Sequence, residues 1–94
     1  MREVSWDEMA NAAGSAYTIQ LEGGSIPVTL DCVEQLPPSG RASGSFRLEF
    51  LGPTDPILPQ AIYPFTGENC EPFEIFIVPI ERDSAGTRYE ATFF

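Results

Sequence analysis

The stretch AYTIQLEGGSIPVTLDCVE, residues 16 to 34, alternates apolar and polar side chains on both sides of a glycine pair. An alternation with a period of two, interrupted by a short glycine turn, is typical of a β-hairpin. The apolar members, which would share one face, are Tyr17, Ile19, Leu21, Ile26, Val28, Leu30 and Cys32. The stretch therefore predicts two antiparallel strands with one buried face, and it places the chain in the β class.

The turn of this hairpin is centred on Gly23 and Gly24, and Pro27 limits how tight it can be. Because proline has no backbone N–H, a two-residue turn would leave a ladder hydrogen bond unmade at Pro27. We therefore expect a four-residue loop over residues 22 to 25, and an edge position near Pro27. The expected pairs are Leu21 with Ile26, Ile19 with Val28, and Tyr17 with Leu30.

Four further segments have the composition of strands, at residues 44 to 51, 60 to 65, 73 to 80 and 87 to 94. Pro64 is expected to break the second of them. The third is apolar on both faces, so we expect both to be buried. Its two faces are Phe73, Ile75 and Ile77, and Phe76, Val78 and Ile80. Six short strands joined by turns predict a mainly β fold, a small antiparallel barrel or sandwich.

The segment before the hairpin, SWDEMANAAG, carries a helix signal. Ser5 can cap the helix, and Glu8 stands three positions later, which is the spacing of a capping box. Gly14 is a suitable terminator. We therefore expect a short helix over residues 6 to 13 that covers one end of the β structure, with Trp6 as its anchor.

A chain of 94 residues is expected to form one domain, over residues 1 to 94. The alternation in each strand and the helix anchor together predict the core. The predicted core residues are Trp6, Ile19, Val28, Leu30, Phe46, Leu48, Phe50, Phe73, Ile75, Phe76, Ile77, Tyr89 and Phe93. On the outer faces of their strands, Arg47 and Glu49 are expected to pair with Arg88 and Glu90.

The net charge of −9 comes from fourteen acidic residues and five arginines. This balance argues against binding nucleic acid or an anionic membrane surface, which both require a basic footprint. No apolar run approaches the roughly 20 residues of a membrane span, and the N-terminal residues do not have the pattern of a signal peptide. We expect a cytoplasmic protein or a part of an exported assembly.

Catalytic and metal-binding chemistry has few candidates in this sequence. The chain has no histidine and no lysine, so it lacks an imidazole base and a Schiff-base nucleophile. Cys32 and Cys70 are far apart in sequence and are expected to be small buried apolar groups, with a disulfide between them as the alternative. We expect no enzymatic activity, no metal site and no cofactor.

The stretch LGPTDPILPQ, residues 51 to 60, contains three prolines. We expect it to form a stiff corner of the fold in which Ile57 and Leu58 close one end of the barrel. If either side chain is exposed, the loop becomes a candidate docking site instead. The candidate partner-binding residues are Pro53, Asp55, Ile57, Leu58, Gln60 and Tyr63.

The blocks LGPTDPILPQAIY, FEIFIVPIERD and RYEATFF resemble a family of small uncharacterised bacterial proteins. The family pattern is GPxDPxLPQxxY, then FEIFLVPI, then a terminal YEAxF. Family members often carry a histidine in the turn that reads TGENCEP here. The resemblance brings no assigned activity, but it implies a link to phage-tail-like collar or fibre proteins and hence an accessory structural role.

These observations support a non-enzymatic adaptor or structural protein, which would dock on a protein partner through an exposed strand edge or an apolar patch. The alternative is a barrel that binds a small ligand or a glycan, or an enzyme of unrecognised type. That alternative would place its site at Asp55, Gln60, Tyr63 and Tyr89, near a barrel mouth.

Overall fold

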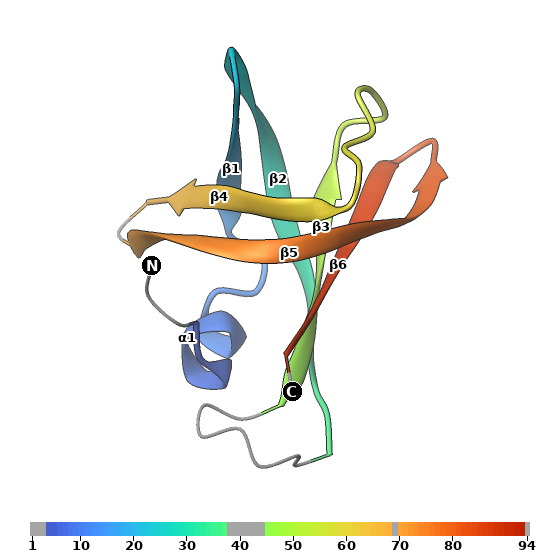
Figure 1. Cartoon of the computed structure of the whole chain (residues 1–94). Helices are drawn as coiled ribbons and strands as arrows, with labels where there is room; N and C mark the ends of the chain where they lie inside the picture. The colour runs from blue at the N-terminus through green and yellow to red at the C-terminus, as the bar shows by residue number, and fades with distance from the viewer. Residues whose placement is uncertain (1–3, 38–44, 69, 94) are drawn as a thin grey trace.

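Six antiparallel strands and one short helix make up the computed structural model, which describes residues 4–37, 45–68 and 70–93 (Figure 1). The strands follow the order β1-β2-β3-β6-β5-β4, and the pairing of β4 with β1 closes the sheet into a barrel. The predicted β class is confirmed, and the architecture is the barrel rather than the sandwich. The elements are α1 (Trp6–Asn11), β1 (Ala16–Leu21), β2 (Gly24–Gln35), β3 (Phe46–Gly52), β4 (Ala61–Gly67), β5 (Cys70–Asp83) and β6 (Gly86–Phe93).

The hairpin of β1 and β2 has a tighter turn than the sequence analysis predicted. Leu21 lies opposite Gly24, so the turn consists only of Glu22 and Gly23. The predicted four-residue loop was wrong, and the register differs from the predicted one by two residues. The apolar residues from Tyr17 to Leu30 still share one face, because a shift of two preserves the alternation of side chains. Cys32 was predicted to share this face, but it lies opposite the outward-facing Glu49 of β3, so that prediction was wrong. Gly23 permits the tight turn with a φ of +86°.

Pro27 fits this hairpin because no ladder partner requires its missing N–H. It lies opposite Thr18 of β1, and β2 begins to pair with β3 only at Thr29. Antiparallel pairs alternate between hydrogen-bonded and non-hydrogen-bonded. Counting from the turn places Pro27 in a non-hydrogen-bonded pair, with its nitrogen on the side where β3 has not yet joined. The expected edge position near Pro27 agrees with this arrangement.

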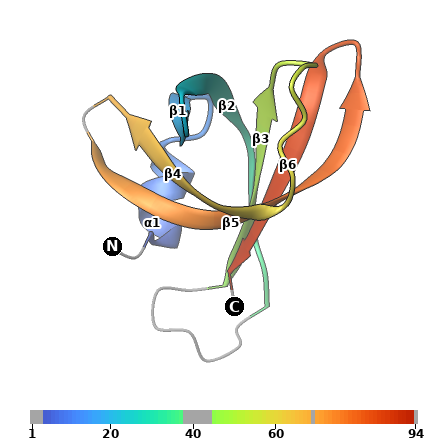
Figure 2. The same ribbon diagram turned by 45° about the horizontal axis from the view of Figure 1, so that its top comes forward.

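Two long strands bend to close the barrel. The first half of β2 pairs with β1 and its second half with β3, with a bulge between Leu30 and Cys32. In the same way β5 passes from β4 to β6, with a bulge between Pro79 and Glu81. A bulge adds a residue to one strand and bends it. Both strands therefore turn a corner of the barrel, and Figure 2 shows the long curve of β5.

Strand β4 continues through Pro64, so the prediction that this proline would break the strand was wrong. Pro64 lies opposite Glu74 of β5, whereas β4 pairs with β1 only over residues 65 to 67. Pro64 stands one residue before the part of β4 that pairs with β1. Its nitrogen can therefore face away from β5 without the loss of a ladder hydrogen bond.

The inward-facing aromatic rings pack as one group at the centre of the barrel. The ring of Tyr17 lies 5.9 Å from that of Phe50 and 5.7 Å from that of Phe73, both edge to face. Phe65 contacts the same two phenylalanines, at 4.9 and 5.5 Å. Such pairs contribute roughly 0.5 to 1.5 kcal/mol each beyond the area they bury.

Most residues predicted for the core are buried, but β5 departs from the prediction. Ile19, Val28, Leu30, Phe46, Leu48, Phe50, Phe73, Ile75, Ile77 and Tyr89 are buried. Trp6 and Phe93 are partly buried and pack against them. Phe76, by contrast, is 50% exposed and Ile80 is 46% exposed. The expectation that both faces of this strand are buried was wrong, because no second layer covers its outer face in the described part of the chain.

Helix α1 begins as predicted and ends two residues earlier. The hydroxyl of Ser5 accepts a hydrogen bond from the backbone N–H of Glu8 at 3.3 Å, as a capping box requires. The helix ends at Asn11 rather than at residue 13. Gly14 follows with a φ of +88° and donates its N–H to the carbonyl of Leu30 in β2. In Figure 1 the helix lies at one end of the barrel, below β4 and β5.

Candidate interaction surface

In the proline loop between β3 and β4, one of the two aliphatic side chains is buried and the other is exposed. Leu58 is 5% exposed, and its N–H donates to the hydroxyl of buried Tyr89 at 3.0 Å. Ile57 is 44% exposed. The loop thus forms a corner of the fold, but of the two side chains predicted to close the barrel end only Leu58 is buried, and the prediction for Ile57 was wrong. The other candidate residues, Pro53, Asp55 and Gln60, are half-buried, exposed and exposed respectively.

Of the residues that the sequence analysis placed at a ligand site near the barrel mouth, the two tyrosines make hydrogen bonds to the proline loop. Tyr89 is fully buried and its hydroxyl is directed at the proline loop, where it also lies 3.5 Å from the Pro56 carbonyl. Tyr63 donates its hydroxyl hydrogen to the Pro59 carbonyl at 2.7 Å, and partial burial raises the pKa of this phenol above its usual value. Both tyrosines therefore tie the loop to the barrel.

The outer surface of β4 and β5 carries an exposed apolar cluster that the sequence analysis assigned to the interior. Ile62 is 65% exposed and lies directly opposite Phe76 of β5. The half-buried residues Pro64 and Val78 stand two positions from these two on the same face, because side chains alternate along a strand. Ile80, in the bulge of β5, continues the cluster. We call these five residues the apolar β4–β5 face.

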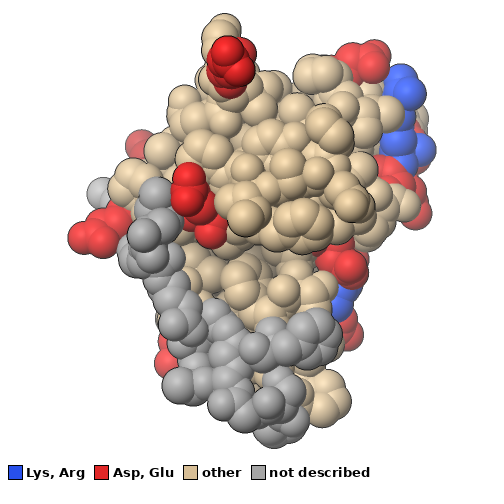
Figure 3. Space-filling model, in the orientation of Figure 1, with Lys and Arg blue, Asp and Glu red and all other residues tan. Residues whose placement is uncertain are grey.

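The surface view supports this arrangement. In Figure 3, uncharged surface covers most of the area over β4 and β5, with acidic atoms to its left and right. The basic atoms visible in this view lie along the right edge, beside acidic ones. Contiguous exposed apolar surface bordered by charged residues is characteristic of protein interaction sites.

The adjoining outer face of β2, β3 and β6 is charged instead. Arg47 contacts three carboxylates, those of Glu34, Glu49 and Glu90. Its hydrogen bonds, with that to Glu49 the strongest, raise the pKa of the Arg47 guanidinium above its ordinary value. The predicted pairing of Arg47 and Glu49 with the arginine and glutamate of β6 is confirmed, since Arg88 also lies 3.6 Å from Glu49.

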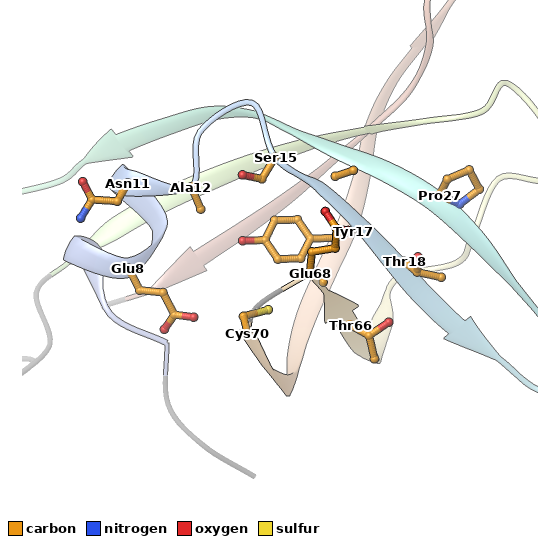
Figure 4. A pocket seen from close by; sticks show the side chains of 12 residues that line it. Glu8, Asn11, Ala12, Ser15, Tyr17, Thr18, Pro27, Thr66, Glu68 and Cys70 are labelled. Carbon is orange, nitrogen blue, oxygen red and sulfur yellow. The ribbon is translucent and has the colours of Figure 1, made fainter.

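A separate hollow of about 770 Å³ lies between α1, the start of β1 and the turn from β4 to β5. Figure 4 shows the ring of Tyr17, the thiol of Cys70 and the carboxylate of Glu8 around it. Its lining mixes hydroxyl, amide, thiol and carboxylate groups, and none of the residues predicted for a ligand site is among them. Sequence reasoning missed this hollow, because its walls, which also include Pro27 of β2, come from segments that no local motif joins.

Both cysteines are free thiols and both are half-buried. The alternative of a disulfide between Cys32 and Cys70 is therefore not realised in the structure. Within residues 4–37, 45–68 and 70–93, no three His, Cys, Asp or Glu side chains are grouped so that they could hold a metal ion. In the same part of the chain, no helix has the length and apolar character needed to cross a membrane.

Comparison with known proteins identifies the class to which this barrel belongs. Residues 4–93 match the model of a family described as a domain of unknown function, DUF6916, and the chain belongs to this family. The resemblance to an uncharacterised family is thereby confirmed at the level of the family. No curated protein and no solved structure matches the chain.

Proposed function

We propose that this protein is a non-enzymatic docking module that binds a protein partner through the apolar β4–β5 face. The observation that carries the proposal is the cross-strand pair of Ile62 and Phe76, which are 65% and 50% exposed. An exposed aromatic residue beside a β-branched one provides a compact apolar anchor, and such anchors supply most of the affinity of a protein interface. Because the strands pair in a closed ring, we base the proposal on the apolar β4–β5 face and not on an exposed strand edge.

A partner of different sequence fits this face better than a second copy of the chain. Each copy carries a net charge of −9. Glu74 lies opposite Pro64, on the same side of β5 as the apolar β4–β5 face, and its side chain is exposed. A symmetric dimer would bring the same acidic surface of two copies together, and like charges at an interface oppose association.

The family resemblance suggests the kind of assembly. The resemblance implies a link to phage-tail-like collar and fibre proteins, and a small adaptor with one apolar face would suit an accessory position in such a structure. We therefore propose a collar or fibre component as the partner.

The proposal is tested by affinity purification from the native host with two tagged baits. One is the wild-type chain, and the other is the double variant Ile62→Ser, Phe76→Ser. We expect one protein to be enriched with the wild type and lost with the double variant. Because both side chains point outward, the melting temperature should remain close to that of the wild type. Quantitative mass spectrometry of the eluates measures the enrichment.

The matched control is Ile57→Ser, which removes an exposed aliphatic side chain from the proline loop instead. This variant should recover the same protein as the wild type. If Ile57→Ser loses the protein and the double variant retains it, the docking site is the proline loop. If the double variant recovers everything that the wild type recovers, the apolar β4–β5 face is not a docking site.

A further inference from the structure

The arginines that the structure describes are paired with carboxylates of the same chain. The chain has five arginines and no lysine, and Arg47, Arg82 and Arg88 lie in the described residues. Each of the three makes at least one ion pair within the chain. The partners are Glu34, Glu49 and Glu90 for Arg47, Asp31 and Glu49 for Arg88, and Asp55 for Arg82. An acidic partner would have to displace these internal pairs to reach a cation.

Two carboxylates at opposite ends of the apolar β4–β5 face have no such cation among the described residues. Glu74 points outward two positions before Phe76, and no ion pair joins it to an arginine of the described chain. Glu81 follows Ile80 and lies opposite Arg88. The guanidinium of Arg88, however, is directed at Asp31, at 2.6 Å, rather than at Glu81.

The spacing of the two carboxylates sets a geometric requirement on a partner. Glu74 and Glu81 are seven positions apart on one strand, which corresponds to at most roughly 23 Å at about 3.3 Å per residue, and the bulge between Pro79 and Glu81 shortens this span. The exposed side chains of Phe76 and Ile80 lie between them in sequence. The strand thus presents two negative charges with an apolar segment between them.

We infer that the partner presents apolar side chains between two basic groups, lysine or arginine, that contact Glu74 and Glu81. This inference rests on the proposed function, because it uses the same face. The apolar contact supplies the affinity, and the two charges select the partner and set its orientation along β5. A second copy of the chain meets the requirement poorly, because it has no lysine and the arginines in its described residues are already paired.

The first test uses two synthetic peptides with the same apolar centre, one with lysines at both ends and one with glutamates. Amide chemical shifts of the isotopically labelled chain report binding. At about 50 mM NaCl, where surface charges are weakly screened, the lysine peptide should bind at least about fivefold more tightly and shift residues of β4 and β5. At about 300 mM NaCl the difference should shrink.

Variants assign the effect to the two carboxylates. Glu74→Gln with Glu81→Gln should remove the preference for the lysine peptide. Glu22→Gln, which removes one carboxylate charge from the exposed turn of the β1–β2 hairpin, should leave it intact. The inference is overturned if both peptides bind equally, if neither binds, or if the Gln variants keep the preference.

Carbodiimide cross-linking of the complex recovered from the host provides an independent readout. This reagent joins a carboxylate directly to an amine, and the chain has no lysine of its own. Cross-links from Glu74 or Glu81 to partner lysines support the inference. A recovered complex that binds the Gln variants as tightly as the wild type overturns it. The loss of the complex in the Ile62→Ser, Phe76→Ser variant separately tests the docking function, so the two failures are distinguishable.

Discussion

At the scale of single residues, Arg47 organises the charged outer face of the barrel. Its side chain is 19% exposed and contacts Glu34, Glu49 and Glu90 from three neighbouring strands. Glu49 and Glu90 lie directly opposite each other on β3 and β6. Without the arginine, two like charges would face each other across the ladder, an arrangement that destabilises a sheet.

Replacement of this residue should therefore cost more than the loss of an exposed ion pair. We expect Arg47→Gln to lower the free energy of unfolding by roughly 1 to 3 kcal/mol, as for hydrogen bonds to charged groups. The matched control is Arg82→Gln, whose pair with Asp55 is exposed and 3.5 Å long, and which should cost roughly 0 to 1 kcal/mol. Urea denaturation of both variants measures the difference, and equal midpoints would show that Arg47 is no more than a surface charge.

Tyr63 gives the stability of the barrel a dependence on alkaline pH. Burial raises the pKa of its phenol in the folded state, whereas in the unfolded chain it ionises near a pKa of about 10. The stabilisation is therefore complete below pH of about 10 and is lost as the pH rises through the folded pKa. We expect Tyr63→Phe to weaken this alkaline loss. Urea midpoints between about pH 8 and pH 11 measure it, and a variant with the wild-type slope would exclude Tyr63 as its source.

At the scale of elements, α1 is attached to the barrel by few contacts, and Trp6 is prominent among them. Its ring lies 6.3 Å from that of Phe46, which stacks in turn on Phe93 at 4.6 Å. Val4 and Met9 on either side of the helix start are buried, as expected for a hydrophobic staple. The helix therefore covers the end of the barrel where β3 begins and β6 ends.

Trp6 is only partly buried, so its removal should cost less than that of a fully buried aromatic residue. We expect Trp6→Ala to lower the free energy of unfolding by roughly 2 to 3 kcal/mol, below the 3 to 5 kcal/mol typical of buried aromatics. Ala10→Ser, on the exposed side of the same helix, is the control and should cost about 0.5 kcal/mol. If Trp6→Ala unfolds at the wild-type urea midpoint, α1 does not contribute to the stability of the barrel.

Strand β5 shows at the same scale how one element serves two purposes. Its inward residues Phe73, Ile75 and Ile77 belong to the core. Its outward residues Phe76 and Ile80 form part of the apolar β4–β5 face. The long strand also links two neighbours, because its first half pairs with β4 and its second half with β6. The same sequence of apolar residues thus closes the barrel and provides the candidate docking surface.

At the scale of the whole molecule, net charge opposes folding and shapes partner choice. A charge of −9 on 94 residues produces self-repulsion in the compact state. Salt screens this repulsion over a Debye length of about 10 Å at 0.1 M. We expect the urea midpoint to rise between about 0.05 and 0.5 M NaCl, because repulsive pairs outnumber the ion pairs that salt also weakens. A midpoint that falls with salt would show that the ion pairs dominate instead.

The pattern of residues determined the strands but not their partners. Alternation predicted the inward faces of β1, β3 and β6 correctly, and that of β2 as far as Leu30, because a period of two is a local property of an extended backbone. The bulge after Leu30 reverses the alternation, so Cys32 lies opposite the outward-facing Glu49 and the prediction for Cys32 was wrong. It could not predict the order β1-β2-β3-β6-β5-β4, since that order depends on contacts between distant segments. The hairpin register was wrong because we centred the turn on Gly23 and Gly24, whereas the turn consists of Glu22 and Gly23 and so leaves Pro27 in a non-hydrogen-bonded pair.

The candidate site was harder to predict than the fold. The apolar run of FEIFIVPI gives no sign of which face is covered, because burial on both sides and exposure on one side have the same sequence signature. Only the tertiary structure shows that nothing in the described chain covers Phe76 and Ile80, and that Ile62 lies beside Phe76. The hollow beside α1 likewise exists only through the meeting of several segments.

The sequence by itself determined the β class, the helix start at Ser5, the stiff corner of the proline loop and the excess of negative charge. Each follows from local backbone preferences or from composition, which need no information about distant residues. The tertiary structure decided how the strands close into a barrel, which of two apolar faces is buried, and which carboxylates the described arginines contact. Those properties depend on the packing of segments far apart in the chain, where the free energy of burial selects one arrangement among several that the local pattern allows.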